Sequence, residues 1–317
     1  MPIYDFIKSN TMVPVADSGS CCVFQMKNES GEGFMTVYEV FPGVTLAYND
    51  YHMKFFESDT IANQDLLCID HCKEGRIEYA IGAGKYSYVE VGDLKIDRLL
   101  DHSGCFEFPL SHYHGITIAF QMKEVIKTLP EEIRDFPVDI NAICKKFCYD
   151  TYPIVIHDAP SIGYVLEGLY NVPEQIKQYY FKVKILELLL YLDALEIPKN
   201  KKEQPYFYKS QVEKIKAIQA LISEHPEQHY TQEYLSKQFK IPLTPMKKCF
   251  KNVYGNPINT YMRISRVNKA AVLLRQNPSS SVTEIAGNVG YDSPSKFAAA
   301  FKNIMGQTPL EYRKNFH

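Results

Sequence analysis

Short runs of apolar and strand-forming residues, separated by turn residues, fill the first 120 positions of the chain. Two runs, Phe34–Phe41 and Val44–Tyr51, flank the turn dipeptide Pro42-Gly43, and their Tyr, Val, Phe and Thr residues favour strands. Later turn signals occur at Glu74-Gly75 and Val91-Gly92-Asp93. Short strands with a turn about every 8–12 residues predict a β-barrel or sandwich, which we assign to residues 1–172.

The pattern becomes helical after Gln121 and is most strongly apolar between residues 173 and 198. Pro173 suits the first turn of a helix, and Pro198 ends it. Apolar residues cover more of this helix than one docking face requires. Two interpretations remain open: the helix packs only on its own barrel, or part of it forms a homodimer contact. The residues predicted for that contact are Tyr180, Val183, Leu186 and Leu190.

Charge divides the chain at a polar stretch, KNKKEQ followed by Pro205, which we interpret as a linker over residues 199–207. Residues 1–205 carry 19 Lys and Arg against 30 Asp and Glu, a net charge of −11. Residues 206–317 carry 16 against 7, a net charge of +9. A basic domain beside an acidic one indicates a polyanion partner for the C-terminal domain. Chance segregation of charge between two domains is the alternative.

Residues 208–317 contain the same pattern of short helices twice. In the first copy Thr231 caps a helix, and a break at Lys240-Ile241-Pro242 precedes a second helix. That second helix has apolar residues at Met246, Phe250 and Val253 and stops at Gly255. The second copy has Ser281 as a cap, Gly290-Tyr291-Asp292 as the turn, Ser293-Pro294 as the next helix start, and Phe297, Phe301 and Ile304 as apolar positions.

Each copy predicts a helix-turn-helix, and a helix over Pro257–Asn277 joins the two. A helix of about 20 residues spans about 30 Å. Successive major-groove faces on one side of B-DNA recur about every 34 Å. The spacing therefore suits two recognition helices that enter neighbouring turns of double-stranded DNA.

The segments FKNVYGNPINTYMRISRVNKAAVLL and SVTEIAGNVGYDSPSKFAAAFKNIMGQTPLEYRK resemble the AraC/XylS family of bacterial transcription regulators. The resemblance covers residues 208–317. One position departs from the family, because Pro242 stands at the N-cap that Ser293 fills in the second copy. More loosely, VYEVFPGVTLAY, HCKEGRIEYAI and EVGDL are similar to the cupin-like effector and dimerisation domain of larger members.

This resemblance implies a homodimer that binds double-stranded DNA and a small-molecule effector. It also implies control of transcription initiation, usually as an activator in this family, with RNA polymerase as a further partner. We accordingly interpret residues 1–172 as the effector-binding domain, 173–198 as the dimerisation segment and 208–317 as the DNA-binding domain.

Recognition helices present the residues of their first turns to the groove. The family's reading positions fall on Thr244, Lys247 and Lys248, so the first unit is predicted to supply most of the direct base readout. The second unit has Ala298 and Ala299, which cannot hydrogen-bond to bases, so it is predicted mainly to bind the phosphate backbone of the DNA. For any single Lys, the alternative is that its side chain is only solvated at the surface and does not contact DNA. The full set predicted to contact DNA is Thr231, Thr244, Lys247, Lys248, Lys251, Thr283, Ser295, Lys296 and Lys302.

Tyrosines flank the predicted strands and suit a pocket for a small, partly apolar ligand, with ordinary core packing as the alternative. The candidate effector-binding residues are Tyr38, Tyr48, His52, His71, Glu78 and His114. His112 and His114 form an HxH motif, but the Glu that a cupin metal site needs after the second His is missing. Weaker candidates for metal or redox chemistry are Cys68 with His71 and Cys72, and the pair Cys144 and Cys148.

The fold class is therefore predicted as α+β, a cupin-like barrel with a helical dimerisation segment linked to an all-α domain. No apolar run reaches the roughly 18 residues of a membrane helix, and the N-terminus lacks the pattern of a secretory signal. Eight Cys are too sparse for a disulfide scaffold, so we expect a cytoplasmic protein. We further expect no catalytic residues, no bound metal and no cofactor. The alternatives to an effector-controlled regulator are a cupin-type metalloenzyme with an appended DNA-binding module and a constitutive DNA-binding protein.

Overall fold

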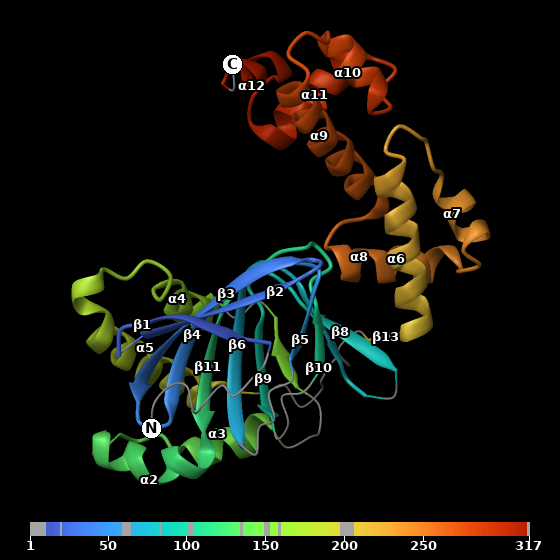
Figure 1. Cartoon of the computed structure of the whole chain (residues 1–317). Helices are drawn as coiled ribbons and strands as arrows, with labels where there is room; N and C mark the ends of the chain where they lie inside the picture. Colours follow the sequence, from blue (N-terminus) through green and yellow to red (C-terminus); the bar gives the residue numbers. More distant parts are fainter. Residues whose placement is uncertain are drawn as a thin grey trace. The chain divides into compact units, whose positions relative to one another are not determined.

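A computed structural model describes residues 11–19, 21–58, 65–82, 84–99, 104–133, 136–148, 153–157, 160–196 and 206–315. The chain divides into two compact units, Met1–Tyr206 and Phe207–His317 (Figure 1). Of the predicted linker at 199–207, residues 199–205 lie outside the described part of the chain. The mixture of sheet and helix confirms the α+β class.

The N-terminal unit contains a large antiparallel sheet (Figure 1). The hairpin predicted at Pro42-Gly43 joins two of its strands, and Gly43 has a positive φ of 78° that suits glycine. The strand order is β1 (Val13–Asp17), β2 (Cys21–Asn28), β3 (Gly31–Phe41), β4 (Val44–His52), β11 (Tyr113–Gln121), β6 (Leu66–Gly75), β9 (Leu94–Leu99) and β12 (Ile154–Ile156).

A second, smaller sheet of the same unit faces the large one. Its strands within this unit are β8 (Lys85–Val89), β7 (Ile77–Ala80), β10 (Gly104–Glu107) and β5 (Phe55–Ser58), in that order. Side chains of both sheets line a common cavity, which is described below. The two faces of the large sheet therefore have different surroundings.

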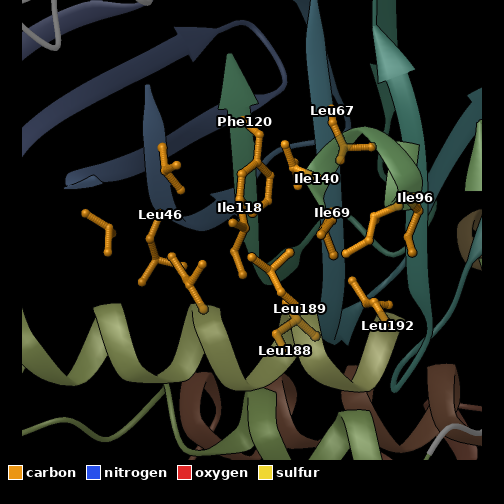
Figure 2. Close-up of a cluster of buried hydrophobic side chains, with 14 of the residues drawn as sticks. Leu46, Leu67, Ile69, Ile96, Ile118, Phe120, Ile140, Leu188, Leu189 and Leu192 are labelled. Carbon is orange, nitrogen blue, oxygen red and sulfur yellow. The ribbon is translucent and has the colours of Figure 1, made fainter. Parts of the chain in front are cut away.

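Helices cover the face of the large sheet that points away from the small one. They are α2 (Met122–Glu132), α3 (Ile140–Phe147), α4 (Pro160–Glu167), the 3₁₀ turn η1 (Glu174–Ile176) and α5 (Lys177–Ala194). Figure 2 shows Leu188, Leu189 and Leu192 of α5 pointing toward Ile118 and Ile69 of the sheet. Alternation along each strand sends Leu46, Ile118, Ile69 and Ile96, which lie opposite one another in register, to this one face.

Helix α5 packs on its own sheet along one side. Its buried residues, Phe181, Ile185, Leu188, Leu189 and Leu192, are each no more than 1% exposed. Burying five such side chains contributes about 10 kcal/mol as an upper estimate. The helix is shorter than the predicted segment at 173–198, because its first turn is a 3₁₀ helix and regular α-helix begins only at Lys177.

The C-terminal unit begins with the two-residue strand β13 (Phe207–Tyr208), and the rest of its regular structure is helical. The helices are α6 (Lys209–Glu224), α7 (Gln232–Gln238), α8 (Leu243–Tyr254), α9 (Ile258–Gln276), α10 (Val282–Asn288), α11 (Pro294–Met305) and α12 (Pro309–Lys314). Phe250 and Phe301, the matching apolar residues of the two predicted copies, are both fully buried. In the described part of the chain, each helix falls short of the length or the hydrophobicity that crossing a bilayer requires.

Candidate nucleic-acid interface and buried cavity

Helices α7 and α8 form the first helix pair of the C-terminal unit. The Thr231 hydroxyl accepts a hydrogen bond from the Tyr234 amide at 3.1 Å, which satisfies a free N–H at the start of α7. Lys240 turns the chain with a positive φ of 49°. Pro242 is the N-cap of helix α8, and its carbonyl accepts from the Met246 amide at 2.9 Å, but its side chain makes no cap bond. The prediction that Pro242 occupies the N-cap of this helix is confirmed.

Helices α10 and α11 form the second pair. The Ser281 hydroxyl caps α10 at the Glu284 amide, and the Ser293 hydroxyl caps α11 at the Lys296 amide. The turn uses Gly290, with a positive φ of 82°, at the place where the first pair uses Lys240. A Cβ at Gly290 would lie 2.6 Å from the backbone oxygen of Glu227, so this close approach requires glycine.

The two pairs match residue by residue, apart from one extra residue in the second turn. Helix α8 and helix α11 each have 12 residues, and each ends at a glycine with left-handed conformation. Thr231 therefore corresponds to Ser281, and not to Thr283, which lies inside α10. Thr231 and Thr283, both predicted DNA contacts, therefore lie at different positions of their helices, and both stay predictions.

All nine residues predicted to contact DNA have exposed side chains. Three are lysines on α8, and within the described residues no carboxylate pairs with Lys247, Lys248 or Lys251. At the matching positions of α11, the second pair has Ala298 and Ala299 in place of the first two lysines. The surface of α8 is thus the more basic of the two.

Arg266 of α9 connects the two helix pairs. Its Nε donates to the carbonyl of Pro226 at 2.6 Å and its Nη2 to that of Gln228 at 2.9 Å, both in the loop before α7. Its Nη1 donates to the carbonyl of Gly290 at 3.3 Å, in the turn before α11. The guanidinium also lies 6.0 Å from the ring of Tyr291. The residue therefore fixes the first pair against the turn of the second, a role that the sequence pattern did not reveal.

A cavity of about 220 Å³ lies between the two sheets of the N-terminal unit. Its apolar wall includes Phe56, Phe106 and Phe108 from the small-sheet side. The opposite wall is a row of large-sheet residues in register across five strands: Val37, Ala47, Thr117, Asp70 and Lys95.

Hydrogen bonds and ion pairs join the polar groups of this wall. The Thr117 hydroxyl donates to Asp70 Oδ1 at 2.6 Å and accepts from Asn49 Nδ2 at 2.9 Å. Lys95 Nζ lies 3.0 Å from Asp70 Oδ2 and 2.9 Å from Asp97 Oδ2. Burial opposes the charged form of Lys95, but the Asp97 and Asp70 carboxylates outweigh it and raise the lysine pKa. Burial also raises the pKa of Asp97 in spite of the nearby lysine.

None of the six candidate effector-binding residues lines this cavity. The six lie elsewhere in the unit. His52 is exposed beside Asp50, and Glu78 is buried and accepts from the Tyr88 hydroxyl at 2.5 Å. Tyr38 and Tyr48 lie on the helix side of the sheet against Phe181, in the wall of a shallow hollow that Lys177 also lines.

The two remaining candidates, His71 and His114, both lie beside Tyr170. His71 Nδ1 lies 3.0 Å from the Tyr170 hydroxyl, and burial lowers the pKa of His71. The His114 ring contacts the Tyr170 ring edge to face. All six candidates alternate with cavity residues such as Val37, Ala47 and Asp70, so they lie on the other face of their strands, and their role in effector binding stays a prediction.

The candidate metal ligands are also separated. Cys68 lines the cavity, whereas His71 points to the helix side, and among the described residues no group of three or more His, Cys, Asp or Glu is placed to hold a metal ion. Burial raises the pKa of Cys72 to about 12, so this thiol stays protonated. A hydrogen bond from Cys148 lowers the pKa of Cys144 to about 7.

Comparison with known proteins places the C-terminal unit in a family. A family model for a helix-turn-helix domain matches residues 235–315. The F1 operon positive regulatory protein of Yersinia pestis is 44% identical over 64 residues, which are 20% of this chain and 21% of that protein. The transcriptional activator RhaR of Mannheimia succiniciproducens is 28% identical over 107 residues, 34% of this chain and 38% of that protein. This chain carries an AraC-type helix-turn-helix domain.

Similarity to a solved structure is also limited to part of this chain. An AraC-type transcriptional regulator from Chromobacterium violaceum is 23% identical over 33% of this chain and 92% of that chain, with a TM-score of 0.31. The matches to the two curated relatives cover less than two fifths of the length of either one. The AraC-type assignment therefore applies to the C-terminal unit, and the resemblance predicted for it is confirmed.

Proposed function

We propose that this protein is a sequence-specific DNA-binding regulator of transcription, with helices α8 and α11 as the recognition helices of two helix-turn-helix units. The observation that carries the proposal is the matched pair of 12-residue helices, each following a shorter capped helix and a left-handed turn. Helix α9, with 19 residues, separates them. That length is about 28 Å, close to the roughly 34 Å repeat of the major groove.

Helix α8 supplies most of the base readout in this proposal. Thr244, Lys247 and Lys248 project from its first two turns, and Lys can donate to guanine O6 and N7. Helix α11 holds the backbone through Ser295 and Lys296, because its alanines offer at most a methyl contact to thymine. Thr231, Lys251, Thr283 and Lys302 complete the proposed DNA contacts as phosphate ligands.

The exposed side of α5 is the proposed homodimer contact. Val183 is 61% exposed and Leu190 is 44% exposed, although the helix buries its other side in the core. Tyr179, one turn before Val183, and Ile176, in the 3₁₀ turn before the helix, are exposed too and extend the apolar stripe. Tyr180 and Leu186, the other predicted dimer residues, pack partly against the core and would contribute less.

The N-terminal unit is the proposed effector domain, with the two facing sheets as a cupin-like barrel around the cavity. A ligand in the cavity would change how a dimer presents its DNA-binding units, which couples two sites through one conformational equilibrium. The proposed outcome is activation of transcription, in line with the names of the two curated relatives, and contact with RNA polymerase would be a further step of the same proposal. The metalloenzyme alternative lacks a supporting ligand cluster among the described residues.

Selection of genomic DNA fragments by the full-length protein tests this function. At about 0.15 M salt, where non-specific phosphate binding is weakened, we expect enrichment of a paired sequence motif. The double variant Lys247→Ala/Lys248→Ala should lose about 10- to 100-fold in affinity for the motif. Lys123→Ala/Lys127→Ala removes the same charge from two exposed lysines of α2 and serves as the control. Equal losses in both variants, or on every DNA sequence, would contradict base readout by α8.

A further inference from the structure

The cavity between the two sheets is larger than the voids of an ordinary protein core. Its volume is about 220 Å³, whereas well-packed cores have few voids larger than one water molecule. An apolar cavity of about 150 Å³ is large enough to bind benzene. The cavity of this protein therefore has room for one ring with a short substituent.

Most of the side chains around the cavity are apolar or aromatic. Phe56, Phe106 and Phe108 line it on the small-sheet side, and Val37 and Ala119 are among the apolar residues of the large-sheet side. A ligand that fills this space would exchange water for contacts with rings and methyl groups. The hydrophobic effect therefore favours a ligand with an apolar body.

The charged groups of the cavity wall already pair with one another. Lys95 and Asp70 are the charged side chains among the described residues that line the cavity. Lys95 Nζ lies 3.0 Å from Asp70 Oδ2 and 2.9 Å from Asp97 Oδ2. The second oxygen of Asp70, Oδ1, accepts a hydrogen bond from the Thr117 hydroxyl at 2.6 Å. Both charges of the wall thus have protein partners before a ligand arrives.

This pairing disfavours a charged ligand of either sign. A ligand carboxylate would have to compete with two carboxylates for Lys95. A ligand ammonium would have to displace Lys95 or Thr117 from Asp70, because Asp97 is not part of the described cavity lining. A charge that enters an apolar cavity without a partner loses its hydration and gains little in return. An uncharged molecule avoids this cost and leaves the paired groups undisturbed.

We propose that the cavity binds a small, uncharged and mainly apolar molecule, of the size of one ring with a short substituent. The apolar body lies against the aromatic side of the cavity, and the paired Lys95 and Asp70 on the opposite wall exclude charged molecules of the same size. This inference rests on the effector role proposed above for the N-terminal unit and names the chemical class of the effector.

Three probes of similar size and different charge test the proposal: ethylbenzene, benzylamine and benzoate. At about pH 7 benzylamine carries an ammonium group where ethylbenzene has its terminal methyl, and benzoate carries a carboxylate. Titration calorimetry on the full chain measures the affinity for each probe. Ethylbenzene should bind at least tenfold more tightly than either charged probe, because it brings no unpaired charge into the cavity. No binding of ethylbenzene, or equal or tighter binding of a charged probe, would overturn the proposal.

Two variants locate the bound probe. Ala119 lines the cavity, so Ala119→Leu fills part of the space and should weaken ethylbenzene binding at least tenfold. Ala80→Leu makes the same change at an exposed residue of the small sheet and should leave the affinity unchanged. Undiminished binding to Ala119→Leu would place the probe elsewhere and refute the assignment. If Ala119→Leu does not fold, nuclear Overhauser effects between ethylbenzene and the Ala119 methyl of the unmodified protein locate the probe, and their absence would refute the assignment too.

Affinity for the selected DNA motif is measured separately, with and without ethylbenzene. Ethylbenzene binding that leaves the DNA affinity unchanged would refute effector control and keep the ligand class. Specific DNA binding by a protein that binds no ethylbenzene would refute the ligand class and keep the regulatory function. The failure of one proposal is therefore distinguishable from the failure of the other.

Discussion

Arg266 links the two helix pairs of the AraC-type domain, so its replacement tests whether their spacing governs DNA binding. The change Arg266→Met keeps the length of the side chain and removes the guanidinium, which donates to the carbonyls of Pro226, Gln228 and Gly290. Hydrogen bonds from a charged donor contribute about 1.5–3 kcal/mol each. The three share one half-buried group, and water can replace part of them, so we expect a loss of about 2–3 kcal/mol in the free energy of unfolding.

The same change should reduce specific DNA binding more than non-specific binding. Without the guanidinium, the loop before α7 is no longer tied to the turn before α11, and the two recognition helices lose their fixed spacing. We expect the affinity for the selected motif to fall about tenfold or more, since part of the binding free energy must then restore that spacing. Fluorescence anisotropy with the motif and with a scrambled duplex measures both affinities, and urea unfolding followed by circular dichroism measures stability.

Arg263→Met is the matched control, because Arg263 is an exposed arginine on the same helix. Arg266→Lys should recover little, since an ammonium group cannot reach three carbonyls in different directions as the guanidinium does. A loss of stability below about 0.5 kcal/mol in Arg266→Met would show that the three bonds contribute nothing. An equal fall in affinity on scrambled DNA would show that Arg266 acts through charge and not through spacing.

Four further outcomes follow from the geometry. Gly290→Ala should destabilise the C-terminal unit by about 2 kcal/mol or more in urea unfolding, because its Cβ would meet backbone atoms at 2.6 Å. Lys240→Gly should stabilise it by up to about 1 kcal/mol, because glycine adopts the positive φ of that turn without strain. Val183→Asp with Leu190→Asp should convert a dimer to a monomer in sedimentation experiments, with the N-terminal unit still folded; an unchanged mass would exclude this face. Burial lowers the pKa of His71, so the unfolded chain binds more protons and stability should fall as the pH drops below about 6.5; His71→Asn should flatten this dependence of Tm on pH.

The helices of the C-terminal unit were predictable because their ends depend on local chemistry. The start of α11 is specified by Ser293 followed by Pro294, and its end by Gly306 in left-handed conformation. Such signals lie within a few residues of what they determine. The hydrogen bonds of Arg266 were not predictable in this way, because the three acceptor carbonyls are 24 to 40 residues away in the chain. Only the folded arrangement brings them to one guanidinium.

The predicted effector residues show a different limit. Residue type alone does not tell which tyrosines and histidines line the cavity, because a shift of one residue along a strand moves a side chain to the opposite face of the sheet. The segment Leu94-Lys95-Ile96-Asp97 does distinguish the two faces of its strand, because charged and apolar residues alternate in it and all four are buried. Two charged residues on one face of a buried strand must face partners or a ligand, since neither can reach bulk water. Alternation of buried charge along a strand is thus a better indication of this cavity than aromatic composition, because the charge requires a compensating group and the tyrosine does not.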